Sequence, residues 1–300
     1  MKKVLFVVMA GTLWLLAACS PVVGPPPVAA DSSQPASSEE MEAVFVPGQR
    51  VGGELRVIAR SSGPDVRWIL PGPRPLDPAV FGTPAMPLGF DPDVGVPLEE
   101  RLTTEDGSAY TTTAGPTPFS NKAAPISGEF VLGVVDRTLI DGPDSQDEAE
   151  FTATFSGPNG KQYTVKLLKV IPKGPVHPFL GGVATNIVQH GGTGIGTRMM
   201  PQVYAYVAFW GVAELSVDGE VVASNRLVHG MITDDVRNEN YELVWNDGVD
   251  PSGTQLHLIL PPTEITPQGP QPSPLPTGFI LPNGVEQPFL HIMFEDVTME

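Results

Sequence analysis

The chain has 300 residues, with 17 basic and 34 acidic side chains and a formal net charge of −17. So few clustered cations argue against a nucleic-acid partner, which needs a basic surface. The 32 glycines and 34 prolines, together about a fifth of the chain, argue against long helices and coiled coils. The single cysteine excludes a disulfide framework and a cysteine-based zinc site.

The N-terminus has the pattern of an export signal. Lys2 and Lys3 are followed by an uncharged, mostly apolar run over residues 4–18. This run is shorter than the roughly 20 residues that a membrane-spanning helix needs, and it has the length of a signal-peptide core. We therefore predict a signal peptide over residues 1–18.

The end of this run carries a specific motif. Leu16, Ala17 and Ala18 precede Cys19, which is the only cysteine of the chain. The motif resembles the lipobox of bacterial lipoproteins. The resemblance implies cleavage before Cys19, acylation of Cys19 with palmitate and other fatty acids, and attachment to a membrane. Ser20, a residue other than aspartate after the cysteine, implies by the same resemblance a lipid-anchored envelope protein of the outer membrane. The resemblance covers only about 20 residues.

The next residues predict a tether and then a folded region. Residues 19–50 are polar and proline-containing, with little to bury, so we expect a disordered tether. Nine prolines fall between positions 64 and 97, and prolines are driven out of central strands. We therefore expect residues 51–127 to be a Pro-rich loop segment with one or two edge strands, and residues 128–300 to be a β-sandwich domain.

Alternating apolar residues and turn signals predict the strands of that domain. Single strands are expected at 54–60, 129–140 and 203–210, and hairpins at 150–171, 214–223, 241–260 and 279–294. Residues 98–104 are the one modest helix candidate. The fold class that follows is all-β, an antiparallel β-sandwich or partly closed barrel with long Pro/Gly-rich loops.

One strand has aromatic residues on both faces. Tyr204, Tyr206 and Trp210 lie opposite the apolar face of the 203–210 strand. Such a row is how β-modules stack on sugars, but it is equally what a strand covered on both sides looks like. We favour the covered strand. A glycan or protein ligand stays open, beside the membrane partner implied by Cys19.

Two His-x-Met pairs suggest a metal site. His229 and Met231 form one pair, and His291 and Met293 form the other. Residues two apart share one face of a strand, so each pair presents an imidazole beside a thioether. His257 points away from the core face that Leu256 and its alternate neighbours occupy. If the three strands are neighbours, these five residues form a soft ligand set suited to copper, in the form of Cu(I).

The sequence gives weaker signals for a calcium site, a phosphate-binding loop or a catalytic site. Asp141, Asp144 and Asp147 fit a solvated loop better than a calcium site, because their spacing is not that of a calcium-binding loop. The glycine-rich run at 191–196 is interpreted as a flexible loop, and no catalytic motif is present. No cofactor is expected, copper excepted. Of three functions, we favour a non-catalytic structural or ligand-binding envelope lipoprotein over a copper-handling lipoprotein or an extracytoplasmic hydrolase.

Overall fold

The structure is a computed structural model that describes residues 55–89, 96–112, 117–137, 145–172 and 182–300. Several sequence-based predictions lie outside these ranges. They include the signal peptide, Cys19 and the tether, together with Asp141 and Asp144 of the acidic run.

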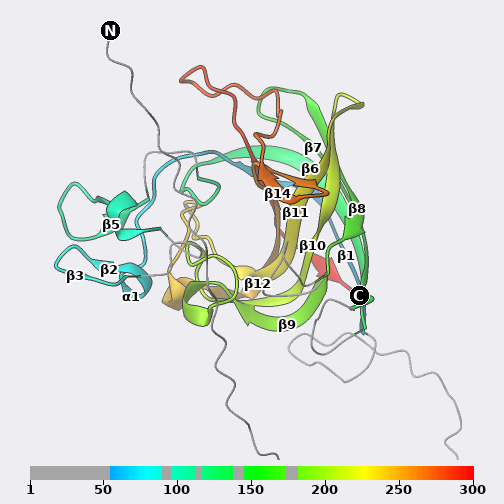
Figure 1. The fold of residues 1–300 in the computed structure, drawn as a ribbon. Coiled ribbons are helices and arrows are strands. Elements are labelled where there is room, and N and C mark those ends of the chain that lie inside the picture. The colour runs from blue at the N-terminus through cyan, green and yellow to red at the C-terminus, as the bar shows by residue number, and fades with distance from the viewer. Residues whose placement is uncertain (1–54, 90–95, 113–116, 138–144, 173–181) are drawn as a thin grey trace, which may run out of the picture. The chain divides into compact units, whose positions relative to one another are not determined.

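Eight of the described strands form a closed antiparallel ring (Figure 1). Their order around the ring is β11, β12, β15, β1, β6, β7, β8 and β10, and β10 then pairs with β11. The prediction of an all-β fold with antiparallel strands is confirmed. The bounds of the eight strands are β1 Leu55–Ile69, β6 Ala123–Asp136, β7 Glu148–Ser156, β8 Gln162–Val170, β10 Val203–Val217, β11 Glu220–Asp235, β12 Asp250–Leu260 and β15 Leu290–Phe294.

Shorter elements decorate the ring. β9 pairs with the first half of β10, β13 and β14 extend from β11, and β16 pairs with β1. These strands are β9 Val183–Gln189, β13 Thr263–Thr266, β14 Gly269–Pro272 and β16 Thr298–Met299. Outside the ring lie α1 Pro78–Phe81 and two small hairpins, β2 Gly82–Thr83 with β3 Met86–Pro87 and β4 Leu102–Thr103 with β5 Tyr110–Thr111.

The helical elements are all short. Besides α1 they are the 3-10 turns Leu98–Glu100, Gly191–Thr193 and Asn246–Gly248. None of the helices in the described part of the chain is long and apolar enough to cross a membrane. The predicted helix at 98–104 is not formed. These residues make the 3-10 turn Leu98–Glu100, and β4 follows it.

Alternation along the strands fills the interior of the ring. Phe151 and Phe155 of β7 point inward, as predicted, and contribute to one continuous buried cluster. Trp68 lies edge-on to Tyr163 with 5.1 Å between ring centroids, and Tyr163 stacks on Phe155 at 5.6 Å. Aromatic pairs of this kind add about 0.5–1.5 kcal/mol each beyond the burial of their surface. The interior is therefore a packed core.

The first strand corrects our expectation of an edge strand. β1 lies between β15 and β6 and is paired on both sides. Pro64 is accommodated because the register between β1 and β6 shifts between Gly63 and Val66, and a bulge is one of the places where a strand tolerates proline. The Pro-rich segment thus supplies an interior strand to the same sheet as the domain that follows it.

Two of the expected hairpins are also wrong. Residues 241–245 make a single bridge, from Leu243 to Arg237, and β12 pairs instead with β11 and β15. Residues 279–281 turn at Asn283 and Gly284 as predicted, but they bond to residues 285–287. The predicted return strand at 289–294 pairs as β15 with β1 and β12 instead. By contrast, the hairpin of β7 and β8 forms as predicted, with Gly160 at a φ of 77° in its turn.

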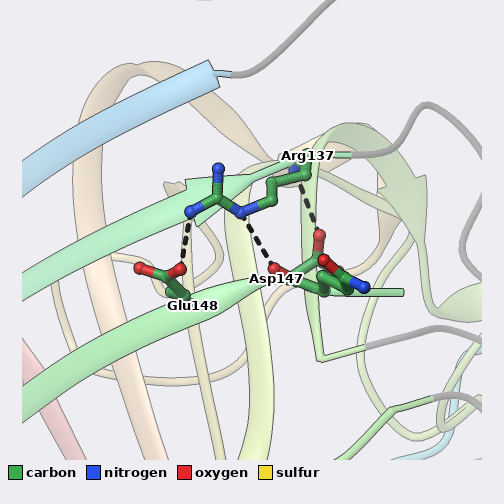
Figure 2. Close-up of polar contacts among 4 residues, drawn as sticks. Arg137, Asp147 and Glu148 are labelled. Atoms are coloured by element: carbon green, nitrogen blue, oxygen red, sulfur yellow. Dashed lines mark hydrogen bonds and ion pairs between the residues drawn. The ribbon is translucent and has the colours of Figure 1, made fainter. Parts of the chain in front are cut away.

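Part of the acidic run is bound into the fold (Figure 2). The backbone N–H of Arg137 donates to Asp147 at 3.0 Å, and the Arg137 guanidinium pairs with Glu148 at 2.6 Å. The side chain of Asp147 is buried, and its second oxygen lies 3.5 Å from the backbone nitrogen of Val183. Asp147 therefore anchors β6, β7 and β9 to one another, which is a structural task.

Candidate functional site

A second buried layer lies on the outer face of the ring. Residues from three covering segments, 117–121, 190–202 and 236–249, pack with β9, β10 and β11 in a separate apolar cluster. Its buried members are Ala184, Met200, Val203, Ala208, Trp210, Met231, Val236 and Leu243. β10 is thus covered on both faces, as we favoured, because Phe209 faces the interior and Trp210 faces this layer.

The structure brings the five predicted residues together in this outer layer. β11, β12 and β15 are neighbours, and Met231, His257 and Met293 lie directly opposite one another across them. In the adjacent row, Ile259 separates His229 from His291. Because side chains alternate along a strand, all five lie on the outer face while Leu256 and Leu258 lie in the core.

His257 and His291 form a buried hydrogen-bonded chain. His291 Nδ1 lies 2.6 Å from the carbonyl oxygen of Pro118, which can only accept, so this nitrogen carries the proton. His291 Nε2 then accepts from His257 Nδ1 at 3.1 Å. It follows that His257 Nε2 bears a lone pair, and this fully buried atom has no partner among the described residues.

His229 is held by β10. Its Nδ1 donates to the carbonyl oxygen of Phe209 at 2.9 Å, so its Nε2 bears the lone pair. Its ring stacks on Trp210, with 4.7 Å between centroids and 10° between planes. His229 retains partial exposure, whereas His190, His257 and His291 are buried.

His190 is a site residue that sequence reasoning missed. It follows β9 directly, with a φ of 66°, and its Nε2 lies 3.2 Å from the sulfur of Met231. Its Nδ1 lies 3.2 Å from the carbonyl oxygen of Thr197. The glycine-rich run that follows packs against it, since a Cβ at Gly196 would come within 2.7 Å of its ring. A histidine bordering a glycine run was the signal available in the sequence.

Burial keeps the histidines of this layer neutral. Desolvation lowers the pKa of His190 to about 3, with a smaller contribution from His229. Desolvation, followed by the positive charge of Arg237, lowers the pKa of His291 to about 3. Desolvation also lowers the pKa of His229 and takes that of His257 well below its ordinary value. Each ring therefore offers one N–H and one lone pair at neutral pH.

Arg237 occupies one side of the layer. Its Nε lies 3.1 Å from the sulfur of Met293, and its Nη1 donates to the carbonyl oxygens of Ser120 at 3.0 Å and Tyr241 at 2.6 Å. Burial lowers its pKa to about 10, so the guanidinium stays charged. The sulfur of Met293 thus faces a cation, whereas that of Met231 faces His190 and the amide of Gln189 at 3.2 Å.

A cavity of about 210 Å³ opens beside His190 and Met231. Phe119, Met200, Trp210 and His229 are among its walls, together with Thr197, Gly196, Leu227, Ile259 and Pro261. In the described ranges, no three histidine, cysteine, aspartate or glutamate side chains are arranged to hold a metal ion. The donor atoms that do converge at the cavity are imidazole nitrogens and thioether sulfurs.

Comparison with protein-family models, curated protein sequences and solved structures finds no match to this chain.

Proposed function

We propose that this protein is an envelope lipoprotein, anchored in the outer membrane through acylated Cys19, whose folded region binds a small ligand without catalysing a reaction. The observation that carries the proposal is the 210 Å³ cavity in the outer layer. Two or more acyl chains hold a protein stably at a membrane, so the folded region needs no membrane-binding face of its own.

The walls of the cavity favour binding over catalysis. Of the described residues that line it, none is a carboxylate, serine, cysteine or lysine, and His190 and His229 are neutral. The volume is below the roughly 300–1,000 Å³ of sites for drug-sized molecules. The face of Trp210 is stacked on His229, which leaves less of it for a sugar ring. A ligand of a few atoms fits these walls better than a glycan or a protein segment.

Small apolar probes test the cavity. Leu227 lines it and Leu168 is exposed on β8, so Leu227→Trp fills the site while Leu168→Trp is a matched control. Benzene and indole at millimolar concentration are expected to raise the melting temperature of the parent and of the control, because a ligand of the folded state stabilises it. Equal stabilisation of Leu227→Trp would show that the probes bind elsewhere. Ester and glycan hydrolysis assays are expected to give no activity.

A second candidate function is the handling of a soft metal. The observation that favours it is the convergence of His229, Met231 and His257 on one face of adjacent strands, with His190 added from the covering segment. Soft thioether ligands select Cu(I) over harder ions. A metal carrier of this kind is also a binding protein without catalysis, so the two candidates share the same cavity.

A further inference from the structure

We infer that His190 Nε2 and Met231 Sδ are two ligands of a Cu(I) site, and that His229 Nε2 supplies a third from across the cavity. This inference rests on the metal-handling function proposed above. It differs from the ligand set predicted from the sequence, in which Met231 and Met293 are both ligands and His190 is not included.

The proton of the neutral His190 ring decides which of its nitrogens can bind a metal. A neutral imidazole has one N–H, yet the two ring nitrogens of His190 face two acceptors, the carbonyl oxygen of Thr197 and the sulfur of Met231, each at 3.2 Å. The carbonyl is the stronger acceptor, because a thioether sulfur accepts only weakly. The proton therefore belongs on Nδ1, and the lone pair of Nε2 points at the sulfur. The Met231 sulfur also accepts from the Gln189 amide at 3.2 Å, so its second lone pair and that of His190 Nε2 are the two that a cation between these atoms would engage.

The separation of these two atoms is close to that of ligands on one metal ion. With the bond lengths known for zinc, about 2.1 Å to nitrogen and about 2.3 Å to sulfur, tetrahedral ligands lie roughly 3.6 Å apart. His190 Nε2 and Met231 Sδ lie 3.2 Å apart, so binding requires them to separate by a few tenths of an ångström. The adjoining cavity gives Met231, an unbranched side chain with adaptable torsions, the room to do so.

A third ligand is near. The rings of His190 and His229 have centroids 6.4 Å apart, and both line the same cavity. The Nδ1 of His229 is engaged with Phe209, which leaves its Nε2 lone pair free to bind. Met200 also lines the cavity and packs in the same cluster as Met231 and Trp210, so a second sulfur lies in the same walls.

The chemistry of this set selects Cu(I). All the candidate ligands are neutral and two are thioethers, whereas zinc sites are built from thiolates, imidazoles and carboxylates. A monovalent ion also carries the smaller charge into a buried layer, and the cost of moving an ion out of water rises steeply with its charge. The cavity walls in the described part of the chain include no carboxylate to compensate a divalent ion.

Met293 provides the internal control. It is as buried as Met231 and lies two strands away in the same cross-strand row, but its sulfur lies 3.1 Å from Nε of the charged Arg237 guanidinium. The amide that contacts the Met231 sulfur is neutral. Both methionines can be changed to leucine with little change in volume. Met231→Leu removes a proposed ligand, whereas Met293→Leu removes a sulfur that faces a cation.

The test is an anaerobic titration of the full chain in detergent with Cu(I), in competition with a chromophoric Cu(I) chelator. We expect one Cu(I) per chain, an affinity at least tenfold weaker for Met231→Leu, and an affinity within twofold of the parent for Met293→Leu. Copper-edge X-ray absorption of the loaded parent is expected to show both sulfur and nitrogen neighbours, and this result does not depend on how a variant folds.

Three results would overturn the site: no specific Cu(I) binding, equal affinities for Met231→Leu and Met293→Leu, or copper surrounded by nitrogen and oxygen alone. If Cu(I) fails while benzene and indole still bind the cavity, the small-ligand function stands and only the copper site falls. If neither Cu(I) nor the apolar probes bind, the proposed ligand-binding function is also wrong.

Discussion

Acid is expected to destabilise the metal-free fold through its buried histidines. His190 and His291 have a pKa of about 3 in the folded state, against about 6.5 when unfolded. The unfolded chain therefore binds more protons below pH 6.5, and the stability that is present above this pH is lost as the pH falls toward 3. Between pH 7.5 and 5.5 the protonation of each histidine lowers the free energy of unfolding by about 1 kcal/mol, or roughly 3 kcal/mol for the two. His257, whose pKa is also lowered, acts in the same direction.

Urea unfolding at several pH values in the presence of a metal chelator measures this effect. The carboxyl groups of Glu295 and Asp235, whose pKa values are raised by burial, act in the opposite direction, so variants are compared with the parent. His291→Asn is expected to reduce the loss of unfolding free energy between pH 7.5 and 5.5 by about 1 kcal/mol. Met293→Leu, a neighbouring change without a titrating group, is expected to keep the parent's dependence. The same pH dependence in His291→Asn and in the parent would refute the reasoning.

Three further outcomes are expected. Cys19→Ala should incorporate no radiolabelled palmitate and should leave the membrane fraction, and equal labelling would contradict the lipobox assignment. Gly230→Ala should lower the free energy of unfolding by about 1–3 kcal/mol, because a Cβ there would come within 2.3 Å of the Phe209 ring; an unchanged denaturation midpoint would contradict this. Limited proteolysis should leave a β-rich fragment that begins between residues 20 and 53, and complete digestion would argue against the folded region.

The core of the fold could be predicted because each inward-facing strand repeats its pattern locally. Phe151 and Phe155 alternate with polar residues, and a tight Asn-Gly turn follows them, so that strand, face and hairpin are all present within about 20 residues. The outward orientation of His257 followed from the same rule, since leucines occupy the alternate positions.

The remaining features depend on contacts between distant segments. Residues 241–245 alternate like a strand, but Leu243 packs onto the outer layer, and alternation alone does not say which surface an apolar face will cover. The place of β1 inside the ring was hidden by the prolines around it, because Pro64 sits at a bulge that only pairing with β6 defines.

In the candidate site, too, the residues on regular strands could be predicted from the sequence and the contacts between distant segments could not. The sequence placed His229 beside Met231 and His291 beside Met293, because the members of each pair lie two residues apart on a strand. Only the pairing of the strands in the structure brings the two pairs together. The sequence could not place His190, whose approach to Met231 depends on the irregular segment after β9. Nor could the sequence show that Met231 and Met293 have different surroundings. The guanidinium that faces Met293 comes from Arg237, more than 50 residues away in the chain.

The most direct test of the Cu(I) site is a crystal structure of the protein loaded anaerobically with Cu(I), with diffraction measured on both sides of the copper absorption edge. We expect one anomalous difference peak between His190 Nε2 and Met231 Sδ, within bonding distance of both and facing His229. A peak beside Met293 and His257, a peak at the protein surface alone, or no peak would contradict the assignment.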